Sequence, residues 1–405
     1  GLRHFAKGIS SISQWTGNEQ QQMAHIFIAI CTGAVDNRVT KAASYLLNFI
    51  HYSQYQRHTS ETLALMQQAL DGFHEVKDIF VDYLVRKEFN IHSLLHYVSA
   101  IRSLGTADGY NTESPEWLHI EYAKKAYHVS NKRDYEIQMT RWLQRQDAED
   151  EEEGSNDDEY ETLAEMLWVS HLEDSVRIAR RCPHPNLHLA DLEHDYSAVD
   201  FLPALCTFLV EHYPDINVTL SHFDVFNMYK TALVPLPPSY HFPDNSSRYT
   251  RIHAVPIRRM RDPRKADTPA HFDTVLAMED RRERQLDPHG MRGLRIAEVR
   301  VIFTLPPELG GAHHQEPLAY VHWYRPLQSL DPVTTMYKLV PSTHHARPNL
   351  SIIRVSDILR TCHLAPKYGS AAVRSSWTST SGSDLLLNKY IDLQMFDMLC
   401  PHVYT

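Results

Sequence analysis

The chain has 405 residues, 43% of them hydrophobic and 22% charged, which is typical of a globular protein large enough for two or three domains. Its longest apolar stretch, Met23–Val35, is shorter than the roughly 18 residues that span a bilayer, which argues against a membrane protein. Five scattered cysteines without a CxxC pair favour reduced thiols of the cytosol or nucleus over a disulfide scaffold. The chain starts at Gly1 and no signal segment follows, so we expect a fragment or a truncated product.

The net charge of −10 comes from one segment. Residues 147–161 hold ten acidic residues and no lysine or arginine, and the remainder of the chain is close to neutral. This segment is too charged and too poor in apolar residues to fold, so we expect an acidic disordered linker. The overall acidity therefore does not exclude a nucleic-acid partner.

Residues 1–146 have the apolar periodicity of helices. The third predicted helix is the clearest, because His58–Glu61 supplies a cap and an apolar face then continues to Leu84, with Arg86 and Lys87 near its end. The fourth predicted helix is 91–104, and Gly105 is expected to end it. The other predicted helices are 23–31 after a turn at Gly17, 39–55, 117–127 and 134–144.

The second half of the chain has a different pattern. Helices are predicted at 160–180 and 198–212, and from Phe223 onward short β-branched and aromatic runs between turn signals predict strands. The alternation in RIAEVRVIF places Ile296, Val299, Val301 and Phe303 partly on one face. The sequence therefore predicts an α+β protein, with a mainly helical N-terminal half and a small β-barrel-like C-terminal domain.

Residues 105–146 contain the most informative chemistry. Glu113 and Glu116 lie three residues apart at a loop-to-helix junction, and four basic residues follow: Lys124, Lys125, Lys132 and Arg133. This pattern is typical of a site in which a carboxylate binds a metal ion and the basic side chains contact the phosphates of a nucleic acid. Helix N-terminal acids favoured by the dipole, and a solvated basic helix face, are the simpler alternatives.

The sequence of this part resembles that of a known family. The strings ISQWTGNEQQQM, FHEVKDIFV, SLLHYVSAIRSLGTADGYNTE, LHIEYAKKAY and MTRWLQRQ are similar to the C-terminal catalytic segment of Plavaka-type fungal DNA transposases, which are related to the Kyakuja–Dileera–Zisupton transposases. Downstream strings such as DFLPAL, ADTPAHFDTVL and CHLAPKYG resemble the extension of the same proteins. The likeness spans almost the whole chain.

The resemblance implies a nuclear enzyme with an RNase H-like core, whose three carboxylates hold Mg²⁺ ions that cleave and join DNA strands. It implies that this chain begins inside a helical insertion and can supply only the third acid, Glu116 or alternatively Glu113. The chain alone is therefore expected to be inactive and to bind Mg²⁺ weakly. Trp117, where relatives carry Arg, and a shortened FNIHSLLHY stretch fit a decaying transposon copy.

The resemblance and the composition together give six segments. These are a helical insertion domain (1–104), C-terminal helices of the RNase H-like core (105–146), the acidic linker (147–161), a helical connector (162–222), a β-rich barrel-like domain (223–370) and a tail with a short helix at 388–399 (371–405).

Other motifs allow more than one interpretation. The basic stretch 251–265 suggests an extended arm that contacts DNA phosphates or, alternatively, a surface loop; its downstream basic residues are Arg258, Arg259, Arg261, Arg264 and Lys265. His92 with His96, and Cys182 with His184 and His188, have metal-ligand spacing but are more often structural.

The β region weakly resembles a bromo-adjacent homology domain, in which Trp323 and Tyr324 would line a peptide-binding surface; core packing is the alternative. A non-enzymatic nuclear protein that binds chromatin or DNA through this region is the rival hypothesis. A helical interaction protein without a DNA role is a third.

Overall fold

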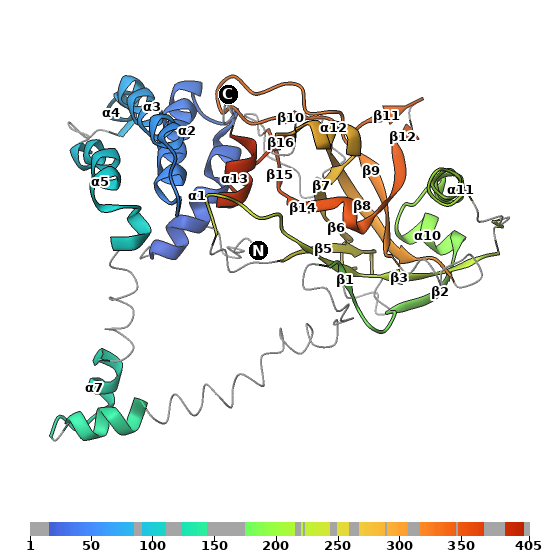
Figure 1. The fold of residues 1–405 in the computed structure, drawn as a ribbon, viewed down its shortest axis with the longest axis horizontal. Coiled ribbons are helices and arrows are strands. Elements are labelled where there is room, and N and C mark those ends of the chain that lie inside the picture. The colour runs from blue at the N-terminus through green and yellow to red at the C-terminus, as the bar shows by residue number, and fades with distance from the viewer. Residues whose placement is uncertain are drawn as a thin grey trace.

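The structure is a computed structural model. It describes residues 16–84, 91–110, 123–133, 135–143, 175–214, 220–221, 223–243, 249–258, 267–287, 290–306, 316–345, 347–367 and 385–400. The described part is α+β, as predicted, with helices at one end, antiparallel sheets in the middle and two further helices at the other end (Figure 1). Among the described residues, no helix is long and apolar enough to cross a membrane. All five cysteines are free thiols.

The first three helices begin at capping residues. Thr16 and Glu19 form a reciprocal capping box, Asp36 accepts the backbone N–H of Arg38, and Thr59 accepts that of Thr62. These caps satisfy N–H groups that have no partner inside a helix. The helices are α1 (Gly17–Cys31), α2 (Asn37–Ser53) and α3 (Ser60–Val76).

The third predicted helix is divided in the structure. It ends at Val76, and α4 (Ile79–Leu84) follows after a turn at Lys77 and Asp78. Apolar periodicity continues across the break, because Ile79 and Phe80 pack on the same side as Phe73. Spacing alone therefore does not reveal the turn.

The next predicted helix begins as a 3₁₀ turn, η2 (His92–His96), and continues as α5 (Tyr97–Leu104). Gly105 ends it with φ of +93°, as expected for a residue without a Cβ. The short elements η3 (Ala107–Tyr110) and α7 (Ala126–Val129) follow, and residues 135–143 are helical.

The largest sheet has the strand order β13-β9-β8-β3-β2, with β7 paired to β8 and β14 paired to β7. All its pairings are antiparallel. Its strands are β2 (His184–His188), β3 (Val225–Tyr229), β7 (Thr274–Met278), β8 (Leu294–Thr304), β9 (Leu318–Trp323), β13 (Leu350–Arg354) and β14 (Ile358–Cys362). The strands predicted within 223–370 are confirmed.

Three smaller sheets complete the β structure, in the orders β1-β4-β5-β6, β10-β16-β15 and β11-β12. The described strands do not close into a barrel, so only the α+β class of the prediction is confirmed. The remaining elements are β1 (Arg177–Ile178), β4 (Thr231–Pro235), β5 (Tyr249–Val255), β6 (His271–Phe272), α12 (Arg281–Leu286), β10 (Lys338–Leu339), β11 (Thr343–His344), β12 (Arg347–Pro348), η6 (Val355–Asp357), β15 (Leu364–Pro366) and β16 (Leu385–Leu387).

The predicted shared face of β8 holds for Val301 and Phe303 but not for all four residues. Val301 and Phe303 pack in a core with α10 and α11, whereas Val299 packs in a second core and Ile296 in a third. A β-bulge between Val299 and Val301 shifts the register against β9. One extra residue reverses the alternation, which explains why the sequence showed no clean period of two.

The connector predicted as helical is only partly so. It contributes β1 to the sheet of β4 and β2 to the edge of the largest sheet, before α10 (Leu189–Asp195) and the predicted helix α11 (Phe201–His212). Pro183 and Pro185 flank His184 and disfavour a helix there, and an edge strand tolerates proline because one side of it needs no ladder hydrogen bonds.

The C-terminal segment joins the helices to the sheets. Helix α13 (Leu393–Leu399) lies between α1–α3 and the strands (Figure 1), and its Phe396 is fully buried in the core of the N-terminal helices. The Tyr390 hydroxyl lies 2.8 Å from both Ser44 Oγ and Asn48 Oδ1 on α2. The predicted helical domain and the predicted tail therefore share one core.

Candidate functional site

The two predicted catalytic acids lie outside the described residues. Glu113 and Glu116 fall within 111–122, between η3 and the helical turn that begins at residue 123. The four basic residues predicted to follow them are described and exposed: Lys124, Lys125, Lys132 and Arg133. Exposure leaves their charges accessible to a phosphate backbone and equally to solvent.

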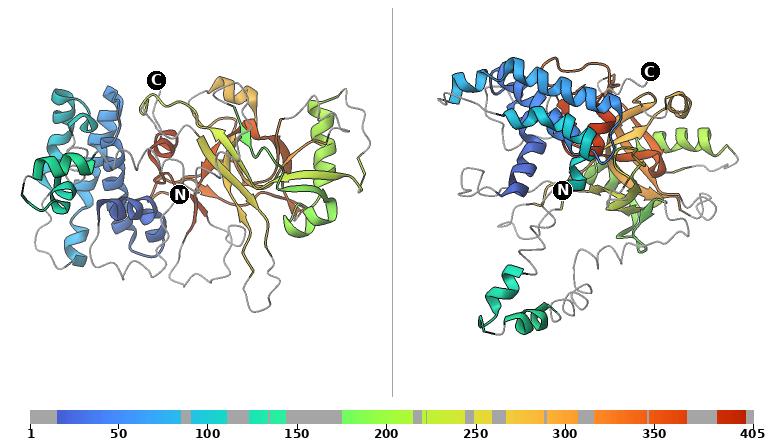
Figure 2. Two further views of the ribbon diagram at one scale, coloured as in Figure 1. Left: turned by 90° about the horizontal axis from the view of Figure 1, so that it is seen from below. Right: turned by 60° about the vertical axis from the view of Figure 1, so that its left-hand side comes forward.

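The predicted basic arm connects β5 and β6. These strands pair at Ala254 with Phe272 and at Val255 with His271, and Arg258 then forms an isolated bridge with Thr268. In Figure 2 (left) the yellow strands of this hairpin project from the edge of the molecule.

Arg258 is exposed, and its backbone N–H and carbonyl bond Thr268 at 3.0 and 2.9 Å. The other predicted contacts lie outside the described residues: Arg259, Arg261, Arg264 and Lys265.

Two histidines and an aspartate meet at the base of this hairpin. Asp273 Oδ2 lies 2.8 Å from His253 Nδ1, and Asp273 Oδ1 lies 3.0 Å from His271 Nε2. The two imidazole rings stack with centroids 4.8 Å apart. One ligand atom from each residue lies within 4.8 Å of the others, an arrangement that could hold a metal ion. We call these three residues the hairpin trio.

The backbone brings the trio together. His271 and Asp273 are two residues apart in an extended segment, which places their side chains on one face. The Asp273 N–H donates to the His253 carbonyl at 3.0 Å, and the His253 N–H donates to Asp273 Oδ2 at 2.8 Å. Burial favours a higher pKa of Asp273, but the hydrogen bonds and charges of the two histidines outweigh it and hold this pKa below its usual value.

The two metal patterns noted in the sequence behave differently. Cys182 donates from Sγ to the Met228 carbonyl at 3.3 Å, and within the described segments it does not assemble with His184 and His188 into a three-ligand group. His92 and His96 are exposed and bring their Nε2 atoms within 3.3 Å. That pair offers two ligands, fewer than structural or catalytic metal sites use.

Trp323 and Tyr324 belong to the core. Their exposed fractions are 6% and 2%, and Trp323 Nε1 donates to Ser351 Oγ at 2.7 Å while the Arg295 guanidinium lies over its ring. The burial of both rings supports core packing over a peptide-binding surface, because neither ring presents a face to a peptide.

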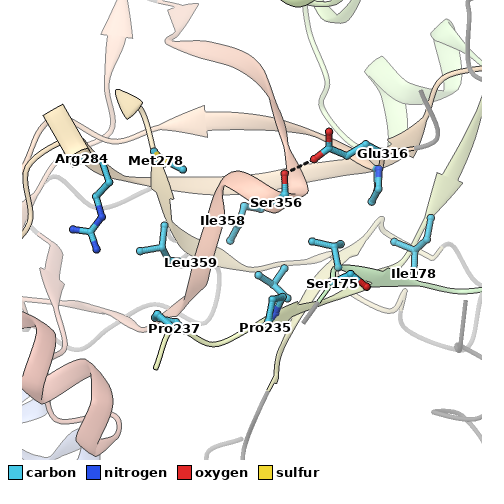
Figure 3. A pocket seen from close by; sticks show the side chains of 13 residues that line it. Ser175, Ile178, Pro235, Pro237, Met278, Arg284, Glu316, Ser356, Ile358 and Leu359 are labelled. Carbon is cyan, nitrogen blue, oxygen red and sulfur yellow. Dashed lines mark hydrogen bonds between the residues drawn. The ribbon is translucent and has the colours of Figure 1, made fainter. Parts of the chain in front are cut away.

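An apolar cavity of about 630 Å³ opens between β4, β7 and the segment from η6 into β14 (Figure 3). Pro235, Ile358 and Leu359 contribute apolar walls, and the Ser356 hydroxyl donates to Glu316 at one end. Arg284 lines the other end, but one of its nitrogens already donates to the Gly290 carbonyl at 2.6 Å. The cavity suits an apolar group more than a charged one.

The chain matches no protein-family model, no curated protein and no solved structure. Local sequence patterns did not identify the hairpin trio. Its signal was the alternating His271-Phe272-Asp273, which lies within the string ADTPAHFDTVL, but pairing with His253 required knowledge of the hairpin register.

Proposed function

We propose that this chain is part of a DNA transposase of the Plavaka type and that it binds DNA through the β5–β6 hairpin. The long family-like strings of residues 1–146 support the descent. Within this proposal, residues 105–146 end an RNase H-like core and supply one of three Mg²⁺-binding acids, Glu116 or Glu113. Action on chromosomal DNA implies a nuclear location.

The observation that carries DNA binding is the projecting basic hairpin. A two-stranded antiparallel ribbon fits the major groove, and β ribbons are an established DNA-reading element. Arg258 is exposed in the last described pair of the β5–β6 hairpin. Residues 259–265, which follow it in the sequence, include four more basic residues and one acid, Asp262. The net charge of the chain does not oppose this role, because its acidity is concentrated in residues 147–161.

Salt-dependent binding of a fluorescent duplex by the full chain tests the proposal. Each phosphate neutralised by a basic side chain contributes about 0.9 to the slope of log K against log salt. If Arg258 and Arg259 each contact a phosphate, Arg258→Gln/Arg259→Gln should reduce this slope by about 1.8. The matched control is Arg38→Gln/Lys41→Gln, which removes two exposed charges from α2. Equal losses in both variants would contradict a specific role of the hairpin.

Strand cleavage is a separate question. The described residues offer no acidic cluster for two Mg²⁺ ions, and the proposal assigns this chain only one of the required acids. We therefore expect the full chain to bind duplex DNA without nicking it in Mg²⁺. Mg²⁺-dependent nicking that Glu116→Gln and Glu113→Gln together abolish would show that these 405 residues contain a complete active site.

A further inference from the structure

The geometry points to a binding site for a divalent first-row transition metal, such as Zn²⁺, formed by His253, His271 and Asp273 at the base of the β5–β6 hairpin. The site is independent of the proposed transposase origin and of the Mg²⁺ site that the origin implies. It rests on the positions of three side chains and on the backbone that holds them.

The donor set selects the metal. Imidazole nitrogens suit zinc, copper, nickel and iron, whereas Mg²⁺ prefers oxygen ligands throughout. A site of two histidines and one carboxylate matches the three protein ligands of catalytic zinc centres, with a fourth position open to water or an external ligand. The exposed face of His271, 61% accessible, leaves that position reachable from solvent.

The ligand atoms are nearly in place. Around a tetrahedral zinc ion with bonds of 2.0–2.1 Å, neighbouring ligand atoms are separated by about 3.3 Å. In the trio, the carboxylate oxygens lie 2.8 and 3.0 Å from the two imidazole nitrogens. Each imidazole nitrogen would move about half an ångström away from its carboxylate oxygen, and ligand atoms that lie up to 4.8 Å apart would approach one another, for an ion to replace the protons that now lie between them.

A backbone hydrogen bond also orients the Asp273 carboxylate. The His253 N–H donates to the same Asp273 oxygen that faces the His253 ring. Hydrogen bonds of this kind, to a ligand from outside the coordination sphere, fix its direction and raise metal affinity. The Asp273 N–H also donates to the His253 carbonyl at 3.0 Å, so the backbone holds the two residues together whether or not a metal is present, and the site is preorganised.

A bound ion would strengthen a weak part of the fold. Strands β5 and β6 share only two paired positions, Ala254 with Phe272 and Val255 with His271. A metal that links His253 on β5 to His271 on β6 closes the hairpin at its base. Because the ion binds the folded hairpin and not the unfolded chain, it should raise the melting temperature.

The test uses the untagged full chain, stripped with EDTA and titrated with Zn²⁺ by calorimetry and with Co²⁺ by visible absorption. Wild type should bind one ion at the trio and give the intense d–d bands of four-coordinate cobalt. His271→Ala should weaken Zn²⁺ binding by at least about tenfold, since even partners outside the coordination sphere contribute about 10–100-fold. The exposed position of His271 makes this variant safe for folding.

The matched control is His194→Ala, which removes an exposed histidine that lies 2.7 Å from the Asp195 carboxylate and outside the trio. Asp273→Asn is the second test variant, and its melting temperature in EDTA reports whether it folds. Both trio variants should lose the cobalt bands and the Zn²⁺-induced rise in melting temperature, and the control should keep both. Wild-type binding no tighter than that of His271→Ala, or equal loss in the control, overturns it.

Discussion

Replacing Phe396 by Ala should destabilise the N-terminal helices and the sheets together. Phe396 lies on α13 near the C-terminus, yet its fully buried ring packs against α2 and against Tyr55, the second residue after α2. Ring centroids lie 4.8 Å from His51, 5.0 Å from Tyr52 and 6.5 Å from Tyr55. The ring is therefore a direct contact between the two ends of the chain.

The magnitude follows from the size of the cavity that the change leaves. Truncating a buried phenylalanine to alanine costs about 3–5 kcal/mol, and edge-to-face ring pairs contribute about 0.5–1.5 kcal/mol beyond area burial. With several ring partners, Phe396→Ala should fall near 5 kcal/mol, a large share of the stability of most domains. Phe223→Ala is the matched control, because Phe223 is 88% exposed and its loss should change the free energy of unfolding by less than about 0.5 kcal/mol.

Hydrogen exchange read by mass spectrometry resolves the two regions. In Phe396→Ala, peptides from α2 and α3 and peptides from β16 should all exchange faster than in wild type, because residues of all three elements share the core that contains the ring. Unchanged exchange in α2 and α3 would refute the shared core and restore the separate helical domain that the sequence suggested.

Two further predictions concern buried groups. Burial lowers the pKa of His51 to about 4, below its ordinary value of 6.5, and its ring bonds the Leu47 carbonyl. Because the folded-state pKa of His51 is depressed, its contribution to stability is full above about pH 6.5 and is lost as pH falls through about 4. This loss is about 3 kcal/mol. The urea midpoint of His51→Gln should therefore decline less steeply with falling pH than that of wild type. Trp323→Phe removes the bond to Ser351 and should cost about 1–3 kcal/mol in urea unfolding, without any histone-peptide binding to lose. An unchanged acid profile, or peptide binding that depends on Trp323, would contradict these assignments.

Much of the helical half was predictable because its signals are local. The capping residues Thr59 and Asp36, the apolar spacing and the terminating Gly105 all act within a few residues of the ends that they define. The turn between Val76 and Ile79 was not predictable, since no glycine or proline marks it and the apolar periodicity continues through it.

The β half shows the limit of local patterns. Its strands were predicted from composition, but their faces were not, because the bulge beside Arg300 depends on pairing with β9. The role of the C-terminal segment was also hidden. The hydrogen bonds of Tyr390 and Asn388 to the N-terminal helices join residues more than 300 positions apart, which no spacing rule relates.

The candidate sites also divide into those that local sequence indicates and those that depend on strand pairing. The resemblance assigned a role to Glu113 or Glu116, and composition indicated the basic arm, whereas the hairpin trio emerged only when β5 and β6 were paired. His253 lies 18 or more residues from the other two members, and the trio forms because the Asp273 N–H bonds the His253 carbonyl and the His253 N–H bonds the Asp273 carboxylate. Sequence alone carried the His271–Asp273 half of the pattern.

Photocrosslinking from the hairpin tests DNA binding most directly. Ile257 is 36% exposed on the hairpin next to Arg258, and p-benzoylphenylalanine placed there should crosslink to a bound duplex in low salt and progressively less as salt rises. The same group at the more exposed Phe223 should crosslink far less. No crosslink from position 257, or equal yields from both positions, would contradict the proposal that this hairpin contacts DNA.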